Sequence, residues 1–175
     1  GVMLRWAGGA NGVLRLERAE RLHTAIIDPG TEGFPGKTLG GCRVQVVGRS
    51  TGPALMICRE PAAVDHRLSL RPGAKGKWDG RFRVSLRGRA DSNALGGQAA
   101  PLPEVRCLGE SGWREISGAV SDARHREVPA PVRPSLPALW DHNGVAAVPL
   151  VGFERPGLAA EFGGFSTQIQ GFDRA

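Results

Sequence analysis

Closely spaced glycines and prolines restrict this chain more than any other feature of its sequence. The 175 residues include 26 glycines and 13 prolines. Both residue types interrupt regular structure, because glycine enters turn conformations freely and proline lacks the backbone N–H. We therefore expect short strands joined by many turns over most of the chain, and few long helices.

Helical periodicity is confined to the first part of the chain. Residues 2–7 are predicted to end a helix that a glycine pair terminates. A second helix is predicted over residues 13–27, where apolar residues recur at helical spacing. The two helices would form a hairpin, and residues 1–36 are interpreted as a helical connector that ends in a loop rich in glycine and proline.

From residue 38 the hydrophobic period changes from 3.6 to 2, which is typical of strands. The predicted strands span residues 42–46, 54–59, 80–86, 105–108, 113–116, 136–140 and 145–148. The strand 105–108 is expected to pair with 113–116, a short helix is expected over 117–127, and the four prolines that follow predict an extended passage.

These patterns predict an α+β fold with a helical hairpin followed by a mostly antiparallel, β-rich domain. The expected domain boundaries give a connector over 1–36, a β-rich domain over 37–153 that handles the substrate, and a tail over 154–175. The tail has little apolar content, so we expect it to be ordered only by docking.

The positive charge is concentrated in one window. The chain has a net charge of +6, and residues 59–89 contain nine basic and three acidic residues, so this window accounts for the whole excess. Such clustering is typical of a surface that binds a polyanion, above all nucleic acid. A solvated charged face is the alternative interpretation, and a GC-rich genome would favour arginine over lysine without explaining the clustering.

The strand pattern indicates how this charge is displayed. Over residues 80–86, Phe82 and Val84 alternate with arginines, so one face is predicted to be apolar and the other basic. Trp78 precedes this strand and has two interpretations, as a ring that stacks on a base or as a core residue. The predicted nucleic-acid-binding residues are Arg59, Lys75, Lys77, Trp78, Arg81, Arg83 and Arg87.

No pattern of an independent catalytic or metal site is found in the sequence. There is no phosphate-binding G-x-x-x-x-G-K-[ST] loop, no H-E-x-x-H pair and no G-x-S-x-G turn. The three cysteines are far apart and odd in number, which favours free thiols in a reducing cytosol. The longest apolar run, residues 145–153, is about half as long as a membrane span, so a cytoplasmic protein without membrane contact is expected.

Four motifs in order carry a resemblance to a known family. They are Thr38-Leu39-Gly40-Gly41-Cys42, Cys58-Arg59-Glu60, Trp78-Asp79-Gly80-Arg81-Phe82-Arg83-Val84 and Leu136-Pro137-Ala138-Leu139-Trp140-Asp141. This succession resembles the region after the catalytic domain of bacterial tRNA(Ile)-lysidine synthetases. The resemblance covers roughly residues 2–153.

The resemblance implies a role in tRNA modification. Enzymes of this family use ATP to adenylate the wobble cytidine of a tRNA(Ile) anticodon and then attach lysine to it. Their catalytic S-G-G-x-D-S loop is absent from this sequence, so no catalytic, ATP-binding, metal-binding or lysine-binding residue is assigned here. We expect no cofactor in this chain, with ATP and magnesium held by a preceding catalytic domain. The expected partners are tRNA and that domain, and the expected function is a non-catalytic tRNA-binding portion of the ligase.

Two other classes of function remain open from the sequence. An arginine-rich face also suits a protein-interaction or scaffold domain that meets an acidic partner. A small hydrolase would require a pocket in which histidine, aspartate and serine converge.

Overall fold

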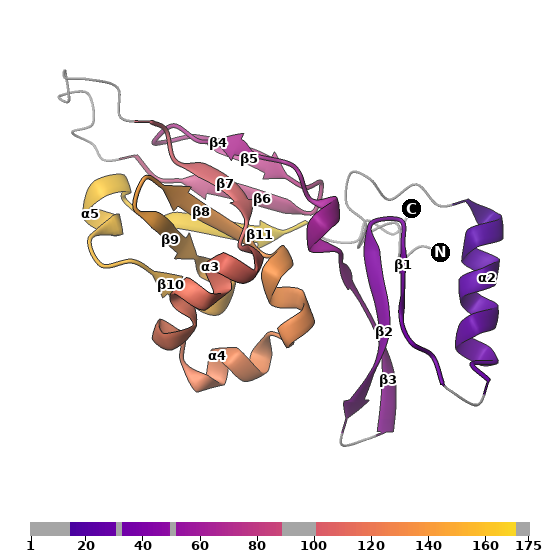
Figure 1. Ribbon diagram of the computed structural model, residues 1–175. Helices are drawn as coiled ribbons and strands as arrows, with labels where there is room; N and C mark the ends of the chain where they lie inside the picture. Colours follow the sequence, from indigo (N-terminus) through magenta and orange to yellow (C-terminus); the bar gives the residue numbers. More distant parts are fainter. Residues whose placement is uncertain (1–14, 31–32, 50–51, 89–100, 171–175) are drawn as a thin grey trace. The chain divides into compact units, whose positions relative to one another are not determined.

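The computed structural model describes residues 15–30, 33–49, 52–88 and 101–170. It confirms an α+β fold, with three antiparallel sheets and a few helices (Figure 1). The chain divides into two compact units, unit 1 from Gly1 to Val64 and unit 2 from Asp65 to Ala175. The boundaries predicted near residues 36 and 153 both fall inside these units and stay predictions.

Unit 1 consists of one described helix beside a three-stranded sheet in the order β1-β2-β3. Its elements are α2 (Leu16–Ile27), β1 (Lys37–Leu39), β2 (Cys42–Arg49), β3 (Gly52–Arg59) and a 3-10 turn (Pro61–Ala63). Leu22 of α2 packs against Cys42 and Val44 of β2, which places the small core between the helix and the sheet.

The sequence prediction for this unit is confirmed only in part. The second predicted helix is α2, and the predicted strands 42–46 and 54–59 lie in β2 and β3, which pair as an antiparallel hairpin. The first predicted helix, residues 2–7, lies outside the described residues. A helical hairpin is therefore not evident: in the described part of unit 1, one α-helix is followed directly by strands.

In its described residues, unit 2 contains two antiparallel sheets and three short helices. The five-stranded sheet has the order β10-β9-β8-β7-β4, and the three-stranded sheet has the order β11-β6-β5. The strands are β4 (Leu68–Ser69), β5 (Lys75–Trp78), β6 (Phe82–Leu86), β7 (Glu104–Cys107), β8 (Pro137–Asp141), β9 (Gly144–Val148), β10 (Phe153–Glu154) and β11 (Phe165–Ile169). The helices are α3 (Gly109–Ile116), α4 (Asp122–Glu127) and α5 (Leu158–Phe162), with 3-10 turns at Ser117–Ala119, Ala130–Ser135 and Pro149–Val151. None of the helices in the described ranges is long and apolar enough to cross a lipid bilayer.

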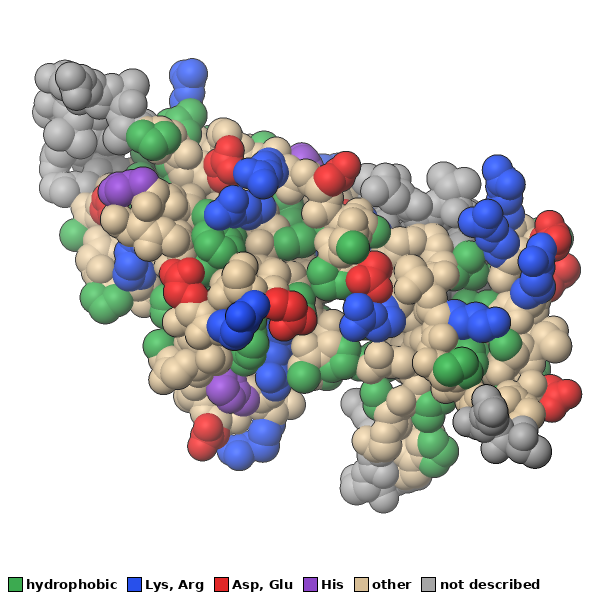
Figure 2. Space-filling view, viewed as in Figure 1, with side chains coloured by type: hydrophobic (Ala, Val, Ile, Leu, Met, Phe, Trp, Pro, Cys, Tyr) green, Lys and Arg blue, Asp and Glu red, His purple; other side chains and the backbone are tan. Residues whose placement is uncertain are grey.

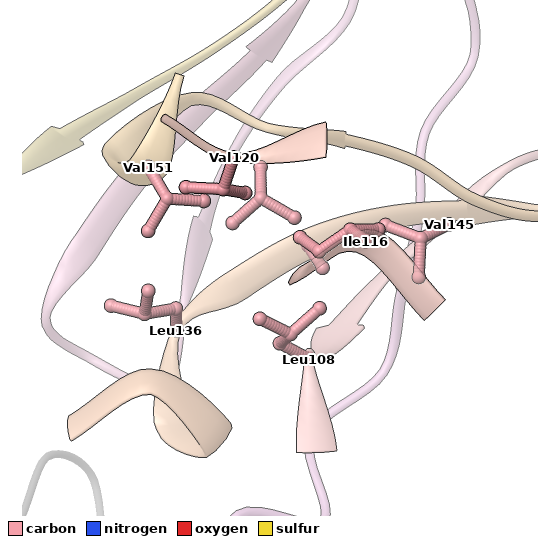
Figure 3. Packing of buried hydrophobic residues seen from close by; sticks show 8 residues of the cluster. Leu108, Ile116, Val120, Leu136, Val145 and Val151 are labelled. Atoms are coloured by element: carbon pink, nitrogen blue, oxygen red, sulfur yellow. The ribbon is translucent and has the colours of Figure 1, made fainter. Parts of the chain in front are cut away.

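An apolar cluster joins α3 to the five-stranded sheet. Figure 3 shows side chains from α3, the strands and the connecting turns pointing toward one another, among them Leu108, Ile116 and Val145. The helix lies close to the sheet because Gly112 faces the indole of Trp140; a Cβ at this glycine would come within 2.8 Å of the ring. The residues of this cluster are at most 7% exposed, so it forms a continuous core on this side of the sheet.

Two local predictions in this region are wrong. Residues 113–116 were expected to be a strand, yet they belong to α3, because a helix buries Gly112 and Ile116 together at i and i+4. The proline-rich passage was expected to be extended, yet Ala130–Ser135 forms a 3-10 turn. Pro131 lies in the first turn of this 3-10 segment. Proline is tolerated there because its fixed φ angle suits a helix and the first N–H groups of a helix have no intrahelical acceptor.

The three-stranded sheet separates apolar from polar side chains. Phe82, Val84 and Leu86 of β6 are buried on its inner face, whereas Arg83 between them is exposed. β11 comes from the predicted tail and pairs with β6 from Phe165↔Leu86 to Ile169↔Phe82. The described part of the tail is thus ordered by strand pairing, and it supplies one edge of the sheet.

A half-buried ion pair stabilises the turn between β8 and β9. Asp141 accepts hydrogen bonds from the Arg155 guanidinium, one of them of 2.9 Å from Nη1, and from the backbone N–H of Asn143 at 2.8 Å. These hydrogen bonds, with that from Arg155 the largest cause, lower the pKa of Asp141 below its usual value although burial opposes the shift. The ionised carboxylate is therefore the form that stabilises the turn.

We expect the Asp141→Asn variant to lose about 1 to 2 kcal/mol of unfolding free energy at neutral pH. The pKa of Asp141 is lower in the folded state than in the unfolded state, where it is near 3.8. The contribution of Asp141 to the free energy of unfolding is therefore complete above the unfolded pKa, and it decreases as the pH falls through the folded pKa. Urea unfolding at a series of pH values measures this difference. The exposed Asp122→Asn substitution serves as the control, and equal acid sensitivity of Asp141→Asn and the wild type would contradict the account.

Candidate nucleic-acid interface

A concave basic surface occupies the outer face of the three-stranded sheet. The depression measures about 660 Å³ and is open to solvent. It is lined by Lys75, Gly76, Lys77, Arg83, Ser85, Arg87, Ser166 and Gln168. We call this surface the basic face.

Strand register explains why these side chains converge. Lys77 lies opposite Arg83, which in turn lies opposite Gln168, so these three side chains form one row across the sheet. In the same way Lys75, Ser85 and Ser166 form a second row. Neighbouring strands lie about 4.8 Å apart and alternate residues about 7 Å apart along a strand, so the rows form a compact grid.

Beneath the basic face, β5 lies close to β4. Gly76 of β5 stands between Lys75 and Lys77, and a Cβ there would come within 2.7 Å of the Leu68 side chain. The inner neighbours of the lysines are thus a glycine and the buried Trp78, while both lysines are exposed. The backbone of β5 is held against the core, and the cations extend into solvent.

The charge of the basic face is uncompensated within the described residues. Its lining holds four cations and no carboxylate, and no described acidic side chain forms a salt bridge with Lys75, Lys77, Arg83 or Arg87. The helical side of unit 2 differs, because basic and acidic side chains lie next to one another there (Figure 2). A surface of one charge sign attracts polyanions and concentrates them from solution.

Arg59 is not part of the basic face, since it belongs to unit 1 and is 1% exposed. Its guanidinium donates hydrogen bonds to the carbonyl oxygens of Gly41 at 2.9 Å and Ala63 at 2.8 Å. Gly41 has no room for a side chain, because a Cβ would come within 2.0 Å of Arg59 Nη1. Arg59 thus joins the β1–β2 turn to the 3-10 turn after β3.

Trp78 and Arg81 are also buried. Trp78 is 0% exposed, its Nε1 donates to the His66 carbonyl oxygen at 2.9 Å, and its ring lies 5.9 Å from that of Phe82. Arg81 is 8% exposed and donates from Nε to the Asp79 carboxylate at 2.8 Å. Asp79 itself has a positive φ of 50°, so this ion pair closes a tight turn between β5 and β6.

The structure therefore brings together four of the seven predicted residues and buries each of the other three within its own unit. Lys75, Lys77, Arg83 and Arg87 line one surface, whereas Arg59, Trp78 and Arg81 make structural contacts inside the fold. Contact of any of the seven with RNA stays a prediction. The alternation of residues 80–86 puts Ser85 on the face of the arginines, whereas Ser166 and Gln168 were not predicted there, although the alternation of residues 165–169 is the pattern that predicts a strand.

The described residues offer no arrangement that would hold a metal ion. Within residues 15–30, 33–49, 52–88 and 101–170, no group of three or more histidine, cysteine, aspartate or glutamate side chains gathers at metal-binding distance. Among the described cysteines, Cys42 and Cys58 are buried and Cys107 is half-buried. The four cations of the basic face suit the binding of anionic groups.

Comparison with known proteins shows similarity to one class of tRNA-modifying enzyme over part of that enzyme's length. No protein-family model and no solved structure matches it. A tRNA(Ile)-lysidine synthase from Caulobacter vibrioides is 31% identical over 147 residues, which are 81% of this chain and 31% of the relative. The chain thus spans about a third of the length of the curated relative it matches. Over most of its own length, this chain is similar to a tRNA(Ile)-lysidine synthase.

Proposed function

We propose that this chain is a non-catalytic, tRNA-binding portion of a tRNA(Ile)-lysidine synthase and that the basic face binds the phosphates of the tRNA. The observation that carries the proposal is the group of four cations on the basic face, which form no salt bridge with any acidic side chain of the described residues. The similarity to a lysidine synthase supports RNA as the polyanion. The complete ligase would convert a cytidine of tRNA(Ile) to lysidine, and this chain would bind the tRNA substrate.

The composition of the basic face favours contacts to the RNA backbone. Lysine and arginine bind phosphates, and the hydroxyl and amide groups of Ser85, Ser166 and Gln168 suit phosphate or ribose oxygens. No aromatic side chain is among the residues that line the depression, so it offers no platform on which a base can stack. Binding at this face is therefore expected to depend little on base sequence.

The test is titration of fluorescently labelled tRNA(Ile) with the 175-residue chain at several salt concentrations. We expect binding at about 50 mM salt that weakens steeply by 200 mM, because each neutralised phosphate releases counterions. Absence of binding at low salt would refute the proposal.

An acidic protein partner is the competing function for the same surface. Competition with polyglutamate at matched charge separates the two, because the carboxylates of an extended polypeptide do not follow the spacing of RNA phosphates. If RNA is the ligand, an unlabelled RNA duplex displaces the tRNA at a far lower concentration than polyglutamate does. Equal displacement by both polymers would favour the protein-interaction function.

A further inference from the structure

A second group of cations lies in unit 1, in a groove between α2 and β1. The groove measures about 260 Å³ and is lined by Arg18, Arg21, Leu22, Lys37, Thr38 and Leu39. Leu22 is buried at 5% exposure and forms the floor, whereas the three cations and Thr38 are exposed along the rims. Figure 1 shows α2 beside the sheet of unit 1, with β1 at the sheet edge.

The cations that line this groove can bind an anion. Neither Arg18 nor Lys37 forms a salt bridge with any carboxylate of the described residues. Arg21 pairs with Glu17 on the exposed surface of α2, a type of contact that contributes little and exchanges readily. Thr38 Oγ1 donates a hydrogen bond of 3.5 Å to Glu60, which also accepts two hydrogen bonds of 3.1 Å from Arg43.

The backbone of β1 adds hydrogen-bond donors to these charges. β1 pairs with β2 on one side only, so it is an edge strand of its sheet. An edge strand leaves alternate N–H groups outside the ladder, and such groups bind oxyanions. Three cations and a strand edge around one small groove match the donors that a phosphate diester requires.

We propose that this groove is a second phosphate-binding site, which takes a backbone phosphate of the same RNA. The inference rests on the proposed function, since that function supplies RNA as the ligand. The groove belongs wholly to unit 1 and the basic face wholly to unit 2, so each unit contributes its own contact. Two linked contacts raise the overall affinity above that of either one.

The test compares two double variants of the 175-residue chain in salt titrations with tRNA(Ile). Arg18→Ala/Lys37→Ala removes two groove cations, and Arg114→Ala/Arg126→Ala removes two exposed cations from α3 and α4 as a control of equal charge. We expect the groove variant to bind about tenfold more weakly and its slope of log affinity against log salt to fall by about 1.4 to 1.8. The control should keep the wild-type slope, and both variants should keep the melting temperature because the replaced side chains are exposed.

The possible outcomes distinguish this inference from the function on which it rests. If the wild type binds and the groove variant binds as tightly with an unchanged slope, the second site is refuted while the basic face stands. If the control loses as much affinity as the groove variant, only total charge matters and the second site is refuted as well. If the wild type fails to bind RNA, the proposed function itself is refuted.

Discussion

Replacing Trp78 with alanine is expected to destabilise the protein by about 3 to 5 kcal/mol, as is typical when a large aromatic side chain is removed from a core. Trp78 is 0% exposed, packs against Phe82 and donates a hydrogen bond to the His66 carbonyl oxygen. A loss of this size is a large fraction of the stability of an ordinary domain. Urea unfolding, followed by circular dichroism, measures it directly.

The Trp78→Phe variant separates a core role from a role in stacking on RNA bases. It keeps an aromatic ring but removes the N–H donor, so we expect a smaller loss of about 1 to 3 kcal/mol. Under conditions where this variant is folded, tRNA affinity should equal that of the wild type. A Trp78→Ala protein with wild-type stability and reduced RNA affinity would show that the ring contacts RNA and not the core.

Replacing Lys75, Lys77 and Arg83 together with alanine is expected to weaken tRNA binding by about 100-fold at constant salt. Each lost contact with a phosphate is expected to cost about 1 kcal/mol of binding free energy, and each 1.4 kcal/mol changes the affinity tenfold. These side chains are exposed and lack carboxylate partners among the described residues, so folding should be unaffected. Fluorescence anisotropy with labelled tRNA(Ile) measures the change.

A triple variant of equal charge provides the control for this experiment. Arg67, Arg114 and Arg126 are exposed cations of unit 2 that do not line the basic face. Their replacement with alanine lowers the net charge by the same amount, so any general effect of charge appears equally in both variants. Equal losses of affinity would mean that the basic face has no special role.

The prediction from sequence succeeded where a pattern is local. Alternation over residues 82–86 correctly separated the inner Phe82, Val84 and Leu86 from the outer Arg83, because strand side chains point to opposite faces. The same alternation placed Arg81 outside with Arg83. It failed there because β6 begins at Phe82, and Arg81 lies in the preceding turn, where Asp79 binds its guanidinium.

Contacts between distant segments could not be predicted in this way. A count of charges includes Arg59, but only the fold shows that the carbonyl oxygens of Gly41 and Ala63 accept its hydrogen bonds. Likewise residues 165–169 have the pattern of a strand, but only the fold shows that their partner is β6, about 80 residues earlier. Only the structure therefore shows that Ser166 and Gln168 of β11 belong to the basic face.

The basic face is proposed to neutralise RNA phosphates. The dependence of tRNA binding on salt concentration tests this neutralisation most directly. The measurement is the slope of log affinity against log salt for tRNA(Ile), compared between the wild type and the Lys75→Ala/Lys77→Ala/Arg83→Ala variant. If each side chain neutralises one phosphate, the slope should become shallower by about 2.1 to 2.7 in the variant. An unchanged slope, with both proteins folded, would contradict the claim and place the RNA contacts elsewhere.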